Sequence, residues 1–211
     1  MSFFPLQKVY ISTKQLLFCK QHHEVTGVTI GERLKMARTM NGFSQRELAG
    51  RAGVTATAIS KYERGVMVPG SGVLLRLSTA LGVRVEYLMR PRVHSIHLTV
   101  PVFRSAGLSE KEEAMVIEKV REWLERYIEV EDLFDLEQQA RPSIPLGYPI
   151  RITDMREVEQ VAINLRRDWG LGIQPIESLT DLLEDKGIKV GAISAPDSFD
   201  ALVFWYNDTT P

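Results

Sequence analysis

Residues 44–69 read SQRELAGRAGVTATAISKYERGVMVP, and this stretch decides the fold of the first half of the chain. Ser44 and Glu47 stand three residues apart, which is the spacing of a capping box and predicts the start of a helix. Gly53 predicts a tight turn with positive φ, and Thr55 after it predicts the cap of a second helix. The stretch therefore predicts two short helices joined by one tight turn.

Helix signals continue on both sides of this pair. Apolar residues at helical spacing predict one helix over 30–40 before it and two more over 71–81 and 83–89 after it. Residues 30–90 are thus expected to form a small all-α domain of five helices. The apolar residues of the central pair are expected in its core, namely Leu48, Ala49, Ala52, Val54, Ile59 and Tyr62.

The charges divide unevenly along the chain, although the net charge is only −1. Residues 30–90 contain 10 Lys and Arg against 4 Asp and Glu. Residues 91–150 contain 7 against 11, and residues 151–211 contain 6 against 11. A basic segment on an acidic remainder is typical of a protein with one polyanion-binding part. Chance clustering of charges on solvated faces is the alternative.

The sequence after residue 90 predicts a connector. Residues 93–102 alternate between apolar and polar side chains, as a linker or a short strand would. Ser109 caps a long helix whose apolar stripe is expected to reach about Gln139. Three prolines and a glycine then break the helical pattern. We therefore expect a linker and a long connector helix over residues 91–150.

The last part of the chain mixes helices and strands. One helix is expected to begin near Asp154 and another at Pro175, each with an apolar face turned inward. Strands are expected over 188–190 and 201–206. Because a two-stranded sheet leaves both edges exposed, residues 151–211 are expected to be a partial α+β unit. The fold class expected for the whole chain is mainly α.

Residues 1–29 show no sustained period and are expected to be a poorly ordered N-terminal extension. The alternative is that the true start lies near Val28. No stretch of 18 apolar residues occurs, so a membrane span is not expected. The single cysteine, Cys19, cannot form an internal disulfide, which fits a cytoplasmic location.

The pattern of residues 44–65 followed by Pro69 resembles the lambda-repressor-like helix-turn-helix family, also called the XRE or Cro type. The resemblance covers residues 30–90. It implies a sequence-specific transcriptional regulator that binds double-stranded DNA, with the second helix of the pair in the major groove. Because one short recognition helix binds weakly, we also expect a homodimer that reads two half-sites. The long helix or the acidic half is expected to supply the dimer contact.

The same resemblance assigns roles to single residues. It implies base contacts from the exposed side of the second helix, at Ala56, Thr57, Ser60 and Lys61. It implies contacts to the DNA backbone from Ser44, Gln45, Thr55 and Arg64. Arg38 and Glu63 match a partly buried ion pair with a structural role. For Lys61 and Arg64 the alternative is a solvated helix face.

A second resemblance begins after residue 100. Segments 103–105, 108–112 and 123–127 are similar to the connector that joins such domains to a zinc peptidase domain of the ImmA/IrrE type. Segments 165–172, 186–190 and 199–202 are similar to the opening of that domain. The catalytic His-Glu-x-x-His motif of the family does not occur in the sequence.

The remaining histidines do not predict a metal site. His94 and His97 stand three residues apart without a third ligand, and His22 and His23 lie in the N-terminal extension. We expect no metal, no cofactor, no catalytic residue and no enzyme activity from this sequence. Two alternatives to the regulator remain open. The chain is the N-terminal portion of a metallopeptidase-type regulator, or an antitoxin-like protein whose acidic half binds a protein partner.

Overall fold

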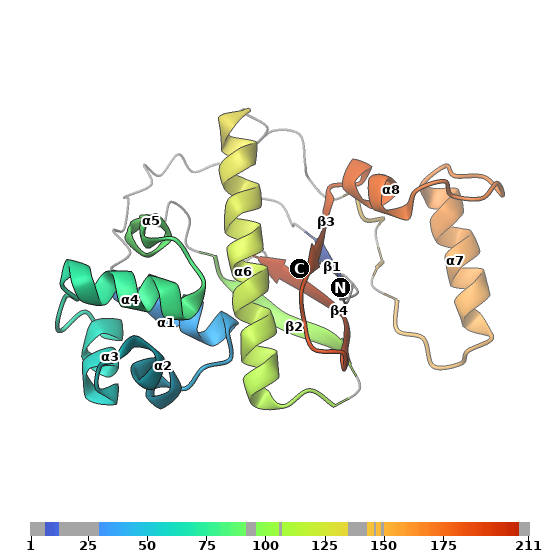
Figure 1. The fold of residues 1–211 in the computed structure, drawn as a ribbon. Helices are drawn as coiled ribbons and strands as arrows, with labels where there is room; N and C mark the ends of the chain where they lie inside the picture. The colour runs from blue at the N-terminus through green and yellow to red at the C-terminus, as the bar shows by residue number, and fades with distance from the viewer. Residues whose placement is uncertain are drawn as a thin grey trace.

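The computed structural model describes residues 7–12, 30–91, 96–105, 107–134, 143–145, 147–148 and 150–206. A helical domain lies on one side of a long helix and a four-stranded sheet lies on the other (Figure 1). The fold is mainly α, as expected. Within the described ranges, no helix is both long enough and apolar enough to cross a membrane.

The helical domain contains the five helices that the sequence predicts. They are α1 (Ile30–Met40), α2 (Gln45–Ala52), α3 (Ala56–Glu63), α4 (Ser71–Leu81) and α5 (Val85–Met89). Each helix contributes apolar side chains to one core, in which Leu34, Leu48, Ile59, Leu77 and Leu88 are almost fully buried. This burial of apolar area holds the short helices together, because none of them is long enough to be stable alone.

Local signals fix the turn between α2 and α3. Ser44 caps α2 in a capping box with Glu47, and Thr55 caps α3 through a hydrogen bond from the Ala58 amide. Gly53 between them has φ of 63°, a left-handed conformation that only glycine adopts without strain. The residues of the turn therefore determine the angle between the two helices.

The long helix α6 (Glu110–Leu133) connects the two parts of the molecule. Ser109 and Glu112 form its capping box, and the helix ends at Leu133 rather than near Gln139, with most of residues 134–139 outside the described ranges. Its buried side chains Val116, Val120 and Leu124 pack against the sheet. The opposite side of α6 contacts α1 of the helical domain.

The sheet has four strands, β1 (Gln7–Ser12), β2 (Leu98–Ser105), β3 (Ile188–Ile193) and β4 (Phe199–Tyr206). Their order is β2-β4-β1-β3. β1 pairs antiparallel with β3 and parallel with β4, and β2 pairs antiparallel with β4. The two C-terminal strands are thus separated by a strand from the start of the chain.

This topology differs from two expectations. Residues 7–12 were expected in a poorly ordered extension, but they form the strand β1 inside the sheet. Residues 98–105 form an edge strand, which decides between the linker and the strand expected over 93–102. The alternation over 93–102 allowed a strand there, but because strand pairing joins residues far apart in the chain, the local pattern gave no signal for β1.

The two helices after residue 150 also differ from expectation. α7 (Glu157–Asp168) begins later than Asp154, and α8 (Leu179–Asp185) begins after a Ser178 cap rather than at Pro175. Neither helix has a buried residue, so the expected inward apolar faces are not covered by the described part of the chain. Figure 1 shows α7 beyond α8, on the side away from α6. The helical period of the sequence defines an apolar face, but it does not say what covers it.

Candidate nucleic-acid interface

The helix α3 presents one side to solvent. Its main contacts are with α1 and α2, and α1 stands between α3 and the long helix α6 (Figure 1). Thr57 and Lys61 are exposed on the outer side of α3. Ser60 is partly exposed, and Ala56 packs against the core with part of its surface accessible. The four side chains predicted to contact bases therefore differ in reach, with Lys61 and Thr57 the most accessible.

The N-termini of α2 and α3 differ in their electrostatics. The Ser44 hydroxyl accepts a hydrogen bond from the Glu47 amide at 3.1 Å, and Thr55 Oγ1 accepts one from the Ala58 amide at 3.1 Å. At α2 the Glu47 carboxylate also accepts a hydrogen bond from the Ser44 amide at 2.6 Å. The first turn of α3 has no acidic residue. A phosphate group is therefore favoured more at the start of α3 than at the start of α2.

The Glu47 carboxylate stays ionised at neutral pH. Hydrogen bonds from the Ser44 amide and hydroxyl, aided by the charge of Lys111, hold the pKa of Glu47 below its ordinary value. Its negative charge stabilises the positive end of the α2 dipole but repels an approaching phosphate. The main role of Ser44 in this structure is therefore to cap α2, rather than to contact a phosphate.

Glu63 organises three elements around one buried carboxylate. Arg38 of α1 donates to it through Nε at 2.5 Å and through Nη2 at 3.1 Å. Gln45 of α2 donates to the same carboxylate through Nε2 at 2.8 Å. The expected ion pair between Arg38 and Glu63 thus has the geometry of a structural link between α1 and α3. Gln45 keeps a second N–H donor that this hydrogen bond does not use.

Arg64 follows the last residue of α3 and is exposed. Its Nε donates to the Ser60 carbonyl at 3.2 Å, which holds the side chain along the end of the helix. The guanidinium has five N–H donors, and this hydrogen bond uses only one of them. The position leaves the charge of Arg64 close to the outer side of α3.

The exposed charges of the helical domain are mainly basic. Seven basic side chains are exposed, at Lys35, Arg46, Arg51, Lys61, Arg64, Arg76 and Arg84. Only three acidic side chains are exposed, at Glu32, Glu47 and Glu86. Such an excess favours association with a polyanion.

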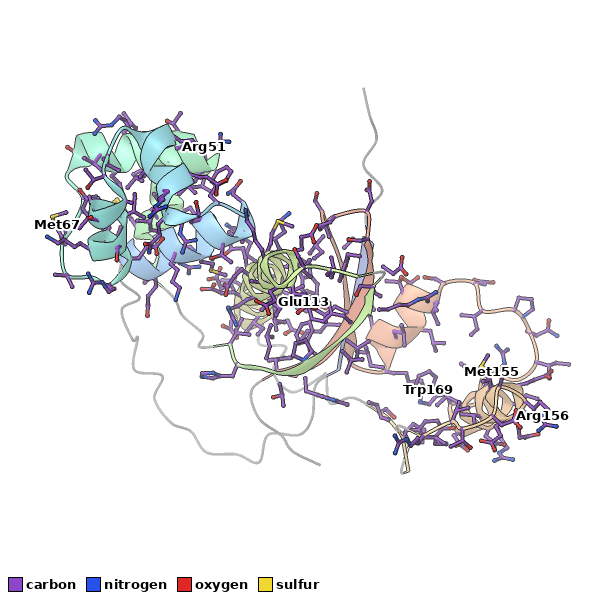
Figure 2. The ribbon with its side chains drawn as sticks, turned by 90° about the horizontal axis from the view of Figure 1, so that it is seen from below. Arg51, Met67, Glu113, Met155, Arg156 and Trp169 are labelled. Carbon is purple, nitrogen blue, oxygen red and sulfur yellow. The ribbon has the colours of Figure 1, made fainter. Side chains whose placement is uncertain are left out.

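Sequence reasoning did not single out Arg46 and Arg51 of α2. The signal was present, because the helical period that turns Leu48 and Ala52 inward turns these two arginines outward. The Arg51 guanidinium lies 4.3 Å from the centre of the Phe43 ring, which orders this exposed side chain. Figure 2 shows Arg51 and Met67 at the surface of the helical domain, away from Glu113 of α6.

The described ranges contain no group of three His, Cys, Asp or Glu side chains arranged to hold a metal ion. Of the four histidines, only His97 lies within these ranges. The predictions that concern His22, His23 and His94 therefore fall outside the described residues.

The turn geometry, the helix order and the shared core define the class of this domain as a helix-turn-helix. Comparison with known proteins agrees, because residues 34–88 match the family described as Helix-turn-helix. The first part of the chain is therefore a helix-turn-helix domain, and through it the chain is related to transcriptional regulators. The match lies within the helical domain.

Two curated relatives from Bacillus subtilis (strain 168) share this segment. One is the SPbeta prophage-derived uncharacterized HTH-type transcriptional regulator YonR, 42% identical over 60 residues, which are 28% of this chain and 56% of that protein. The other is the HTH-type transcriptional regulator ImmR, 36% identical over 62 residues, which are 29% of this chain and 49% of that protein. The chain thus spans about half the length of these curated relatives.

Two solved structures are similar over the same segment. The P22 c2 repressor in complex with synthetic operator 9T is 35% identical, with 30% of this chain and 96% of that chain covered and a TM-score of 0.29. The master regulator for biofilm formation SinR in complex with DNA is 36% identical, with 29% and 100% covered and a TM-score of 0.29.

Proposed function

We propose that this chain is a sequence-specific, DNA-binding transcriptional regulator that places α3 in the major groove. One observation carries the proposal: the outer side of α3 is exposed and basic, and the acidic half of the chain contacts the other side of α1. An α-helix fits the major groove of B-DNA, which is about 12 Å wide. The curated relatives YonR and ImmR are HTH-type transcriptional regulators, which supports the same proposal.

The proposed contacts follow from exposure and chemistry. Lys61 donates to guanine O6 and N7, and Thr57 offers a hydroxyl or a methyl group to a base edge. Ala56 and Ser60 are partly exposed, and their small side chains make van der Waals contact with the neighbouring base. Thr55, Arg64 and the second N–H of Gln45 contact the phosphate backbone of the DNA. Ser44 contributes least to these contacts, because the Glu47 carboxylate lies beside it.

Selection of bound duplexes from a random pool tests the proposal directly. We expect one enriched half-site, and an affinity that falls steeply as the salt concentration rises. Lys61→Ala is expected to cost about 1–3 kcal/mol of binding free energy, roughly a 5- to 150-fold loss of affinity, and to relax the preference at one base position. Adding Gln45→Ala is expected to weaken binding further.

Lys35→Ala is the matched control for this experiment. It removes the same charge from the same domain, but Lys35 lines a small cavity with Glu118 and Arg121 of α6, on the other side of α1. Its affinity should stay close to that of the unchanged protein. Absence of any enriched sequence, or equal losses in Lys61→Ala and Lys35→Ala, would show that α3 does not read DNA.

We also propose that the regulator acts as a homodimer. The long helix α6 was expected to supply the dimer contact, but its main apolar stripe packs against the sheet of the same chain. The C-terminal end of the same helix keeps large apolar side chains exposed, including Leu133 at 81% and Phe134 at 68%. Leu133→Glu is therefore expected to shift a dimer toward monomer in sedimentation experiments, and an unchanged mass would place the interface elsewhere.

A protein partner of the acidic half is a second candidate function, which one observation favours. Large apolar side chains in and around α7 are exposed, with Met155 at 82% and Ile173 at 94%. Large exposed apolar side chains in one region of a protein are typical of an interaction site. Co-purification of a partner that is lost on Ile173→Asp would support this candidate. Recovery of the chain alone, at every salt concentration, would oppose it.

The order α7, α8, β3, β4 after residue 150 supports the proposal that residues 151–206 are the opening of an ImmA/IrrE-like α+β region. That proposal assigns no catalytic residue to the chain.

A further inference from the structure

An open cavity of about 570 Å³ lies where the helical domain meets the long helix. Its walls come from α5 and the residues on either side of it, and from Arg126 of α6. Val83, Tyr87 and Met89 give it an apolar lining. The volume lies within the range of cavities that hold small organic ligands, about 300–1,000 Å³.

Three arginines, Arg84, Arg90 and Arg126, line this cavity together with one carboxylate, Glu86. Arg126 pairs with Glu122 at 2.7 Å, but 57% of its side chain remains exposed. Arg84 is exposed as well. Two guanidinium groups thus keep N–H donors that reach the solvent at the mouth of the cavity.

Arg90 is partly buried and surrounded by three carboxylates, none of them at close range. Its ion-pair distances to Glu122, Glu125 and Glu129 are 3.4, 3.8 and 3.6 Å. These are long for charged hydrogen bonds, which are typically about 2.7–2.9 Å. The reason is that Glu122 and Glu125 are shared with Arg33, whose own distances to them are 3.3 and 2.5 Å. The carboxylates of α6 are therefore already engaged.

Two buried polar atoms of the lining residues have no hydrogen-bond partner among the described residues. They are the Arg90 Nε and the Tyr87 hydroxyl oxygen. Buried polar atoms in folded proteins are almost always paired, and leaving one unpaired costs free energy. The Arg90 Nε–H can only donate a hydrogen bond, so the group that satisfies it must be an acceptor, whereas the Tyr87 hydroxyl can donate or accept.

We propose that this cavity binds a small organic anion with an apolar body, a carboxylate or a similar acidic group. The anionic group accepts hydrogen bonds from Arg90 and Arg126, and the apolar body lies against Val83, Tyr87 and Met89. Glu86 sets the orientation, because an anion is repelled from its side of the cavity. The ligand contacts both α5 and α6, so it binds at the junction between the two parts of the molecule.

Benzoate and hexanoate are suitable probes, with benzamide and hexanamide as neutral counterparts of the same shape. The experiment follows the Nε–H signals of the arginines by NMR in the full chain, without DNA, so its result does not depend on the proposed function. We expect the Arg90 signal to shift saturably with the carboxylates, with a Kd of about 1–10 mM for ligands of this size. The amides are expected to bind at least about 5-fold more weakly.

Arg84→Gln and Arg126→Gln test the location of the site, since both residues are exposed and their loss should leave the fold intact. Each is expected to weaken carboxylate binding by about 5-fold or more. Arg104→Gln, an exposed arginine on β2, is the control and should change nothing. No saturable shift up to about 50 mM, equal binding of the amides, or binding unaffected by both variants would overturn the proposal.

Discussion

The ion pair between Arg33 and Glu125 joins the helical domain to α6. Removing either charge alone is predicted to lower the free energy of unfolding at least as much as removing both charges together. Arg33 Nη1 donates to Glu125 at 2.8 Å and Nη2 donates at 2.5 Å, and both side chains are 0% exposed. Burial alone would lower the pKa of Arg33, but the hydrogen bonds and charge of Glu125 raise it. The Arg33 guanidinium is therefore charged in the interior.

The size of the effect follows from what remains after each substitution. In Arg33→Met, the buried Glu125 carboxylate loses both hydrogen bonds from Arg33 and keeps the more distant Arg90, at 3.8 Å. In Glu125→Leu, the buried guanidinium keeps Glu122 at 3.3 Å. Breaking a buried pair costs about 3–5 kcal/mol, and these remaining partners place each single variant near the lower end, about 3 kcal/mol. The double variant leaves neither charge unpaired, so we expect a cost of no more than about 3 kcal/mol.

Urea unfolding of the four proteins at neutral pH measures this non-additivity, provided that the dependence of the free energy on urea is the same in each. The exposed pair Arg104–Asp200, at 3.7 Å, gives a matched control cycle in which every change should stay below about 1 kcal/mol. Single variants that each cost less than about 1 kcal/mol, or a double variant that costs their full sum, would refute the reasoning.

Two further predictions concern the helical domain. Gly31→Ala puts a Cβ 2.2 Å from the Tyr62 carbonyl oxygen and should destabilise the domain by about 1–3 kcal/mol, whereas Gly50→Ala, with nothing within 4 Å, should stabilise it by roughly 0.5–1 kcal/mol in the same urea experiment. Equal stability of the two variants would contradict the close approach of α1 to α3. Ser44→Ala removes the hydroxyl but not the amide hydrogen bond to Glu47, so an NMR titration should find the pKa of Glu47 raised part of the way to its ordinary 4.5. Because folding depresses this pKa, the cap stabilises the protein above pH 4.5, and its benefit should disappear as the pH falls through the folded-state pKa. A pKa of Glu47 that Ser44→Ala leaves unchanged would contradict the capping geometry.

The helix-turn-helix was predictable because its determinants are local. A capping residue acts on an amide three positions away, and Gly53 acts on its own backbone dihedral. The apolar period within each helix then selects the buried side, and Leu48 and Ile59 lie where the sequence predicts them. The same period leaves Thr57 and Lys61 on the accessible side of α3, where the resemblance to the helix-turn-helix family implies base contacts.

The strands β3 and β4 were predictable from the sequence, but β1 and the pairing of the strands were not, because the determinants of pairing are distant. β1 and β3 pair residues from opposite ends of the chain, such as Tyr10 with Val190. Gly191 of β3 illustrates the point, because a Cβ there would lie 2.4 Å from the Trp123 ring of α6. In the sequence this glycine is an ordinary residue of a short strand. Only the packing of a helix 68 positions earlier explains why it has no side chain.

Charged residues show the limit of sequence reasoning most clearly. By composition all ten basic residues of the helical domain count equally toward binding a polyanion. In the structure Arg33, Arg38 and Arg90 turn inward to carboxylates of α3 and α6, and seven remain exposed. The inward three fix the domain internally and against α6, so the basic side of α3 has one orientation relative to the sheet. If two chains associate through α6, the spacing of their α3 helices is then set by these buried ion pairs rather than by a flexible linker.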